Sequence, residues 1–122
     1  MATYTLPSKL RAPARVPLGY VFVSQGALDA LNRVHVPLVH FLIRHIRGDW
    51  GRLSDEDWQR NERALHTRHY LQSSYLLSSG QKIWMHTTSK RSATIVLLPA
   101  EWFQLESSLR YELLAPPLTD PE

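Results

Sequence analysis

The stretch from His40 to Trp58, HFLIRHIRGDWGRLSDEDW, holds the densest group of side chains that could do chemistry. A metal-independent ribonuclease needs a base, an acid and a cation that stabilises the charged phosphorane. His45 and Asp49 supply the first two types of group, and Arg91 is a candidate cation from further along the chain. The wider set of residues that could fill these roles is His45, Arg47, Asp49, His86, Lys90 and Arg91.

The same residues have a structural interpretation. Successive residues of an α-helix lie 100° apart, so a helix that ends at Arg47 would place His45 within its apolar arc. A histidine in that position is a core residue whose nitrogens need partners. Arg91 falls in a predicted turn between two strands. This interpretation is the simpler one, and the sequence therefore favours a protein without catalytic activity.

Metal and cofactor sites find little support in the residue types. Cysteine is absent, which excludes disulfides, thiolate catalysis and cysteine-ligated metals. His66 and His69 have helical i, i+3 spacing, but no acid close in sequence completes a site. His40 and His45 would lie about 140° apart on one helix and could not share an ion. With no glycine-rich phosphate loop or dinucleotide fingerprint either, we predict no metal and no cofactor.

Arg47-Gly48-Asp49 matches the RGD tripeptide of integrin ligands. A match of three residues is common by chance. The N-terminal region has no apolar run of the kind that a signal peptide needs, and no window is apolar enough to cross a bilayer. We therefore expect a soluble cytoplasmic protein with no membrane partner, and adhesion is disfavoured.

Charge is divided unevenly along the chain. Residues 1–100 carry 13 Lys or Arg against 6 Asp or Glu, whereas residues 101–122 carry one Arg against 5 acids. A basic body can attract polyanions, and an acidic end can also neutralise it. If the body binds nucleic acid, the predicted contacts are Arg44, Arg47, Arg52, Lys90 and Arg91.

Capping residues mark the helices in the first half of the chain. Pro37 suits a first helical turn, because its missing N–H has no partner there, and Gly48 suits the end of that helix. Ser54 is a good N-cap, and the acids that follow it favour the helix dipole. The predicted elements are a strand over 20–23 and helices over about 26–32, 37–47 and 54–65.

After His66 the pattern changes from helical to strand-like. Three β-rich runs joined by short turns predict an antiparallel meander, and a final helix follows Pro99. We predict an α+β fold, in which an N-terminal strand and two to three helices pack on a three- to four-stranded antiparallel sheet, with a C-terminal helix. The predicted organisation is a flexible basic proline-rich arm over 1–19, one domain over 20–114 and a disordered tail over 115–122.

Two further residues are candidates for function. Trp50 follows Asp49 between two helices that needed only a glycine turn to join them. Asn61 shares a helix face with Trp58 and Leu65, so it would be partly buried and need partners. Four tryptophans in a short chain also suit a protein-binding surface or a homodimer, because aromatic residues are enriched at interfaces.

Three segments carry a resemblance to a known group of proteins. They are the H-x-R-G-D-W-G motif at His45 to Gly51, the acidic stretch leading to Ala-Leu at Asp55 to Leu65, and KIW...TT...RSATIVLLP.EW at Lys82 to Trp102. With these, the chain resembles short uncharacterised proteins of bacterial plasmids and integrative elements, some of which are labelled as type I restriction subunit M. The resemblance implies an accessory gene of mobile DNA, acting against host defence or in plasmid maintenance.

Three hypotheses of function follow. The leading one is a small, non-enzymatic accessory protein of a mobile genetic element, which contacts nucleic acid or a nucleic-acid-bound host complex through a basic surface. The second is a metal-independent ribonuclease-like toxin. The third is a protein-binding inhibitor of host defence or a homodimeric interaction module.

Overall fold

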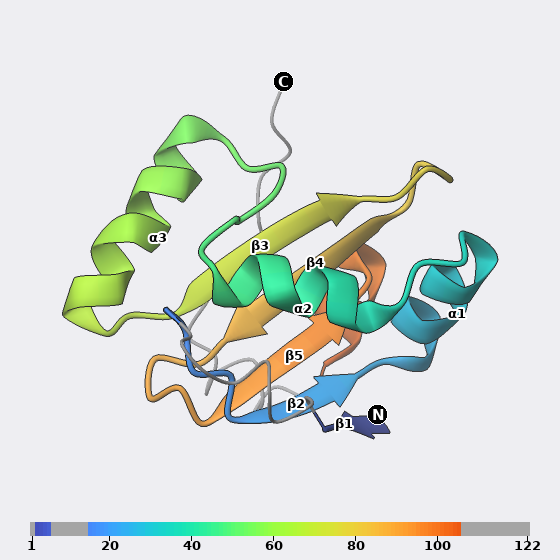
Figure 1. The fold of residues 1–122 in the computed structure, drawn as a ribbon, viewed down its shortest axis with the longest axis horizontal. Helices are drawn as coiled ribbons and strands as arrows, with labels where there is room; N and C mark the ends of the chain where they lie inside the picture. Colours follow the sequence, from blue (N-terminus) through green and yellow to red (C-terminus); the bar gives the residue numbers. More distant parts are fainter. Residues whose placement is uncertain (1, 6–14, 106–122) are drawn as a thin grey trace.

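Three α-helices and a five-stranded mixed sheet form an α+β arrangement, in which the three helices follow one another between β2 and β3 (Figure 1). The computed structural model describes residues 2–5 and 15–105. None of the helices in that part of the chain is long and apolar enough to cross a membrane. The elements are β1 (Ala2–Tyr4), β2 (Tyr20–Val23), α1 (Gln25–Arg33), α2 (Leu38–Ile46), α3 (Asp55–Thr67), β3 (Leu71–Leu76), β4 (Lys82–Thr87), β5 (Ala93–Leu97) and the 3-10 helix η2 (Pro99–Gln104).

The strand order is β1-β2-β5-β4-β3. The meander β3-β4-β5 is antiparallel, as the three β-rich runs predicted. The prediction of a wholly antiparallel sheet of three to four strands was wrong, because β2 pairs parallel to β5, with Tyr20 opposite Ala93 and Val23 opposite Val96. Turn residues mark antiparallel neighbours in a sequence, but a parallel pair joined by a long crossover leaves no such local mark.

Helix α2 lies across one face of the sheet, and its apolar arc forms much of the core (Figure 1). Leu38, Phe41, Leu42 and Ile46 are buried, as the helical spacing predicts. Removing a large buried side chain of this kind costs about 2–5 kcal/mol. The sheet residues that they face alternate along the strands, and they include Val21, Val23, Leu71, Tyr75, Ile83, Met85 and Val96.

A smaller cluster covers the other face of the sheet. Trp84, Ile95 and Leu97 are buried there against Trp102 of η2. The Ser24 hydroxyl accepts a hydrogen bond from the Ala27 N–H at 3.0 Å, which caps α1, and donates one to Glu101 at 2.6 Å. This contact ties η2 to the start of α1.

The two ends of the chain differ from the predicted picture in specific ways. Within the predicted arm, Ala2–Tyr4 pairs with β2 as an edge strand, and Val16 and Leu18 are buried. The described part of the predicted C-terminal helix is a 3-10 helix that ends at Leu105 in an extended conformation. The rest of that helix and the predicted tail over 115–122 lie outside the described residues.

Helix α3 lies beyond the β3 edge of the sheet (Figure 1). Ser54 caps its first turn, accepting a hydrogen bond from the Asp57 N–H at 3.2 Å, as the sequence predicts. The helix runs two residues past the predicted end, to Thr67, and Arg68 closes it in the left-handed conformation with φ 56°. The chain therefore turns at Arg68 and enters β3.

Candidate functional site

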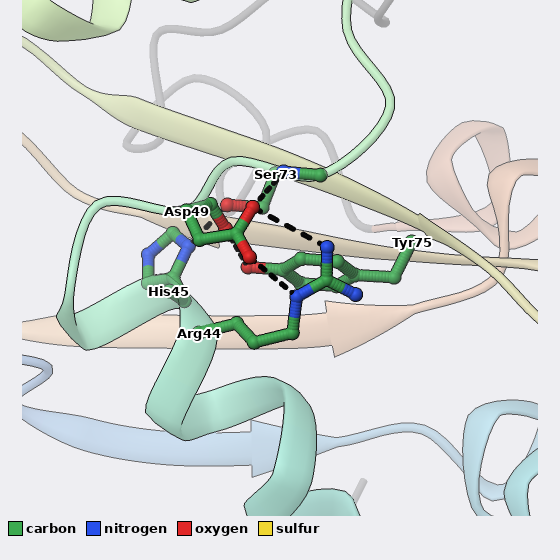
Figure 2. A network of polar contacts seen from close by, with 6 residues as sticks. Arg44, His45, Asp49, Ser73 and Tyr75 are labelled. Carbon is green, nitrogen blue, oxygen red and sulfur yellow. Dashed lines mark hydrogen bonds and ion pairs between the residues drawn. The ribbon is translucent and has the colours of Figure 1, made fainter.

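Arg44 and Asp49 form an ion pair at the C-terminal end of α2 (Figure 2). Arg44 Nε lies 2.7 Å from one carboxylate oxygen and Nη2 lies 3.3 Å from the other. The hydrogen bond from Arg44 lowers the pKa of Asp49, and the same bond raises the pKa of Arg44. The guanidinium also lies over the Tyr75 ring, 4.6 Å from its centroid. Arg44, a predicted nucleic-acid contact, therefore has its charge matched within the fold.

Residues Trp50 to Arg52 add backbone pairing to the exposed edge of β3. The Ser74 N–H donates to Trp50 O at 3.1 Å, and the Arg52 N–H donates to Ser74 O at 2.6 Å. Gly51 sits between them with φ +76°, and a Cβ there would lie 2.2 Å from Ser74 O. Only glycine fits that position, which explains the second glycine of the H-x-R-G-D-W-G motif.

Asn61 covers the same edge of β3 at Gln72, two residues before Ser74. Its amide nitrogen donates to Gln72 O at 2.6 Å, and its amide oxygen accepts from the Gln72 N–H at 3.2 Å. The side chain thus pairs with β3 as a neighbouring strand would. Together with residues 50–52, Asn61 closes an edge that would otherwise attract another strand.

Trp50 is fully buried and connects the motif to α3. Its indole N–H donates to Glu62 at 3.1 Å, and the other oxygen of Glu62 accepts from Arg15 at 3.0 Å. The ring packs edge-on against His45, with centroids 5.5 Å apart. Trp50 therefore anchors the segment between α2 and α3 and has no surface free for a ligand.

His45 lies at the centre of a buried polar chain. Its Nδ1 lies 2.5 Å from the Ser73 hydroxyl and its Nε2 lies 2.8 Å from the Thr87 hydroxyl. Thr87 bonds Thr94 at 2.7 Å, and Thr94 donates to Leu18 O at 2.9 Å.

Each hydroxyl in this chain has one proton to give. Because Thr94 gives its proton to a carbonyl, Thr87 must donate to Thr94 and must accept from His45. His45 therefore carries a proton on Nε2, and because burial lowers its pKa to about 3, the ring is neutral near pH 7. A neutral ring with both nitrogens engaged and no exposed surface has the role of a core residue.

Arg91 closes the turn between β4 and β5 in the left-handed conformation with φ 58°. Its guanidinium donates to His69 O at 2.6 Å, Thr88 O at 3.1 Å and Ala64 O at 3.0 Å. These bonds fix the turn against the end of α3. The three candidate catalytic residues, His45, Asp49 and Arg91, are therefore held in three separate sets of contacts.

Exposed basic side chains gather where α3 ends and the β4-β5 turn meets it. We call this group the basic end, defined as Arg63, His66, Arg68, His69 and Lys90, all of which are exposed. Segments 63–70 and 88–92 contain no Asp or Glu. Of the predicted contacts, Lys90 belongs to this group, whereas Arg47 and Arg52 are exposed on the segment after α2.

A pocket of about 270 Å³ opens beside the basic end, lined by Arg60, Arg63, Ala64, Thr67, His69 and Tyr70. The sequence pointed to His69 only as a possible metal ligand, and it predicted no role for the other five residues. The signal was present in α3, where all three acids of the first turn precede Arg60 and Arg63. What could not be read from the sequence is the contact of Arg91 with Ala64 and His69, which brings the two basic segments together.

His86 is a second buried histidine, on the opposite face of the sheet from His45. It stacks on Trp102 with centroids 4.5 Å apart, and its Nδ1 lies 3.1 Å from the Gln72 amide nitrogen. Its Nε2 has no partner within the described part of the chain. Burial lowers the pKa of His86 to about 3, so the ring is neutral near pH 7.

No group of three His, Asp or Glu among residues 2–5 and 15–105 is placed to hold a metal ion. Models of known protein families, curated protein sequences and solved structures give no match to the chain.

Proposed function

We propose that this protein is a non-enzymatic nucleic-acid-binding accessory protein of a mobile genetic element, and that the basic end is its contact surface. The observation that carries the proposal is the gathering of exposed Arg63, Arg68 and Lys90 in two segments that contain no acid. Phosphate groups are the natural partners of such a cluster. The mobile-element origin rests on the resemblance of the H-x-R-G-D-W-G and LLPxEW segments.

A cation is a candidate contact only if its charge is not already paired or bonded within the fold. Arg44 is paired with Asp49, and Arg91 is bonded to backbone carbonyls, so neither has its charge freely presented. Lys90 keeps its predicted role, and Arg63 and Arg68 join it. Arg47 and Arg52 are exposed and extend the positive surface along the chain after α2.

The ribonuclease alternative gains no support from the geometry. The two histidines that were candidates for its base, His45 and His86, are fully buried, and both ring nitrogens of His45 are hydrogen bonded. A general base must reach the proton that it removes, and a substrate cannot approach either ring without opening the core.

Binding of a labelled oligonucleotide, followed by fluorescence anisotropy at increasing salt, tests the proposal. If Arg63, Arg68 and Lys90 each contact one phosphate, the logarithm of the binding constant should fall with the logarithm of salt with a slope of about −2 for a single strand. Arg63→Ala should weaken binding and reduce that slope by about 0.7.

Arg33→Ala is the matched control, because it removes the same charge from the exposed end of α1, on the far side of the molecule from α3 (Figure 1). It should leave the affinity nearly unchanged. Equal losses for the two variants would mean that net charge alone acts, and absence of binding to any oligonucleotide at low salt would remove the proposal.

A further inference from the structure

The pocket beside the basic end has walls of two chemical kinds. The Tyr70 ring, the methyl group of Ala64 and the methylene stems of Arg60 and Arg63 are apolar. The guanidinium groups, the Thr67 hydroxyl and the His69 ring supply the polar part. A flat, largely uncharged ring joined to an anion matches such a lining better than a simple phosphate does.

Arg60 is held rigidly at this site. It donates to Tyr70 O at 3.2 Å, to the Asn61 amide oxygen at 3.0 Å and to the Gln72 amide oxygen at 3.1 Å. Its guanidinium lies over the Tyr70 ring, 4.2 Å from the centroid. The negative charge of Asp57 also favours the charged form of the Arg60 guanidinium. Because these bonds fix the plane of the guanidinium, the stacked pair is a preformed platform and loses little freedom on binding.

His69 adds a directed polar group to the rim. The Thr67 hydroxyl donates its single proton to Arg63 O at 3.1 Å, so it accepts from Nδ1 of His69 at 2.9 Å. The outer nitrogen, Nε2, has no hydrogen-bond partner shown among residues 15–105. In this tautomer Nε2 is an acceptor, so it can take a hydrogen bond from an N–H group at the edge of a base.

We infer that the pocket takes the base of one unpaired nucleotide, whose phosphate lies on the basic end, and that the protein prefers single strands to duplex. Base stacking on aromatic and guanidinium planes is the usual way in which proteins hold single strands. In a duplex the bases are stacked inside, and presenting one to the pocket would require it to flip out. This inference rests on the proposed function and specifies its ligand.

Three ligands with the same label separate the base from the phosphates. They are a 12-nucleotide oligothymidine, an abasic strand with the same number of phosphates, and a 12-base-pair duplex. One stacked base should make the oligothymidine bind about tenfold more tightly than the abasic strand. Oligouridine, run alongside, distinguishes RNA from DNA as the better ligand.

Variants locate the effect in the pocket. Tyr70→Ala should reduce the affinity for oligothymidine to that for the abasic strand, whereas Tyr70→Phe keeps the ring and should keep the preference. Tyr20→Ala, at an exposed tyrosine of β2, is the matched control and should change nothing. If Tyr70→Ala unfolds the protein, Thr67→Phe at an exposed position fills the pocket and should abolish the preference in the same way.

The outcomes distinguish the two proposals. Equal affinity for oligothymidine and the abasic strand would overturn the base pocket and leave the basic end as a phosphate-binding surface. A preference for oligothymidine that survives both Tyr70→Ala and Thr67→Phe would also overturn the pocket. Failure of all the ligands to bind at low salt would overturn the proposed function itself.

Discussion

Lowering the pH should destabilise the protein through its two buried histidines, His45 and His86. The pKa of each ring is lowered to about 3, mainly by burial. Charge interactions add to the effect, with Arg91 for His45, and with His45 and then Arg60 for His86. In an unfolded chain histidine titrates near pH 6.5. Between about pH 6.5 and pH 3 the unfolded chain therefore binds protons that the folded protein does not.

The sign and size follow from proton linkage. The stability contributed by the neutral rings is complete above pH 6.5 and is lost as the pH falls toward 3. Each histidine lowers the free energy of unfolding by about 1.4 kcal/mol per pH unit within that window. From pH 6.5 to 4.5 the two together cost about 5 kcal/mol, which is a large part of the 5–15 kcal/mol that is typical of a whole domain.

Urea denaturation between pH 8 and pH 4.5 measures this loss. His86→Gln should remove about half of the slope, whereas His40→Gln, at an exposed position of α2, should leave it unchanged. NMR of the imidazole nitrogens should show His45 neutral at pH 5 with its proton on Nε2. A doubly protonated His45 ring in the folded protein at pH 5, or a free energy of unfolding that is flat over this range, would refute the reasoning.

Three further changes test the packing around β3, each measured by urea denaturation at pH 7.5. Gly51→Ala should cost about 3 kcal/mol, because a Cβ would meet Ser74 O and Tyr75, whereas Gly80→Ala, also at positive φ but with no neighbour within 4 Å, should cost about 1 kcal/mol. Similar costs at the two glycines would contradict the edge pairing. Asn61→Leu should cost about 3 kcal/mol by removing both hydrogen bonds from its amide to the Gln72 backbone; a neutral effect would mean that water replaces the amide. Arg91→Ala should cost about 2 kcal/mol through lost carbonyl contacts, and an unchanged stability would mean that the turn does not need them.

Local signals in the sequence predicted much of the fold. Ser54 caps α3, Pro37 stands immediately before α2, and the three β-rich runs form a meander. Each of these depends on residues within a few positions of one another. The 3.6-residue period also placed His45 on the buried side of α2.

The features that the sequence did not reveal depend on distant contacts. The parallel pairing of Tyr20–Val23 with β5 has no turn residue to mark it. The pairing of Trp50 to Arg52 with Ser74, and of Asn61 with Gln72, follows from where α3 is placed against the sheet edge. Asp49, which seemed unnecessary for a simple helix turn, is explained by its ion pair with Arg44. Trp50 is explained by its bonds to Ser74 and Glu62.

The candidate site in the structure differs from the one predicted from the sequence for the same reason, because it also depends on contacts between distant residues. Two of the nucleic-acid contacts that were predicted from the basic charge of the sequence, Arg44 and Arg91, are bonded within the fold. Exposed Arg63 and Arg68 come next to Lys90 only because Arg91 holds the β4-β5 turn against the end of α3. The charged residues can be counted in the sequence, but which of them lie together on one surface cannot be read from it.

An NMR titration of the amide-labelled protein with 12-nucleotide oligothymidine at low salt tests the central claim most directly. Binding at the basic end predicts that the largest shift changes fall in segments 63–70 and 88–92, and that α1, over Gln25–Arg33, stays unperturbed. Shift changes centred on α1 or β1, or none at any ligand concentration, would contradict it.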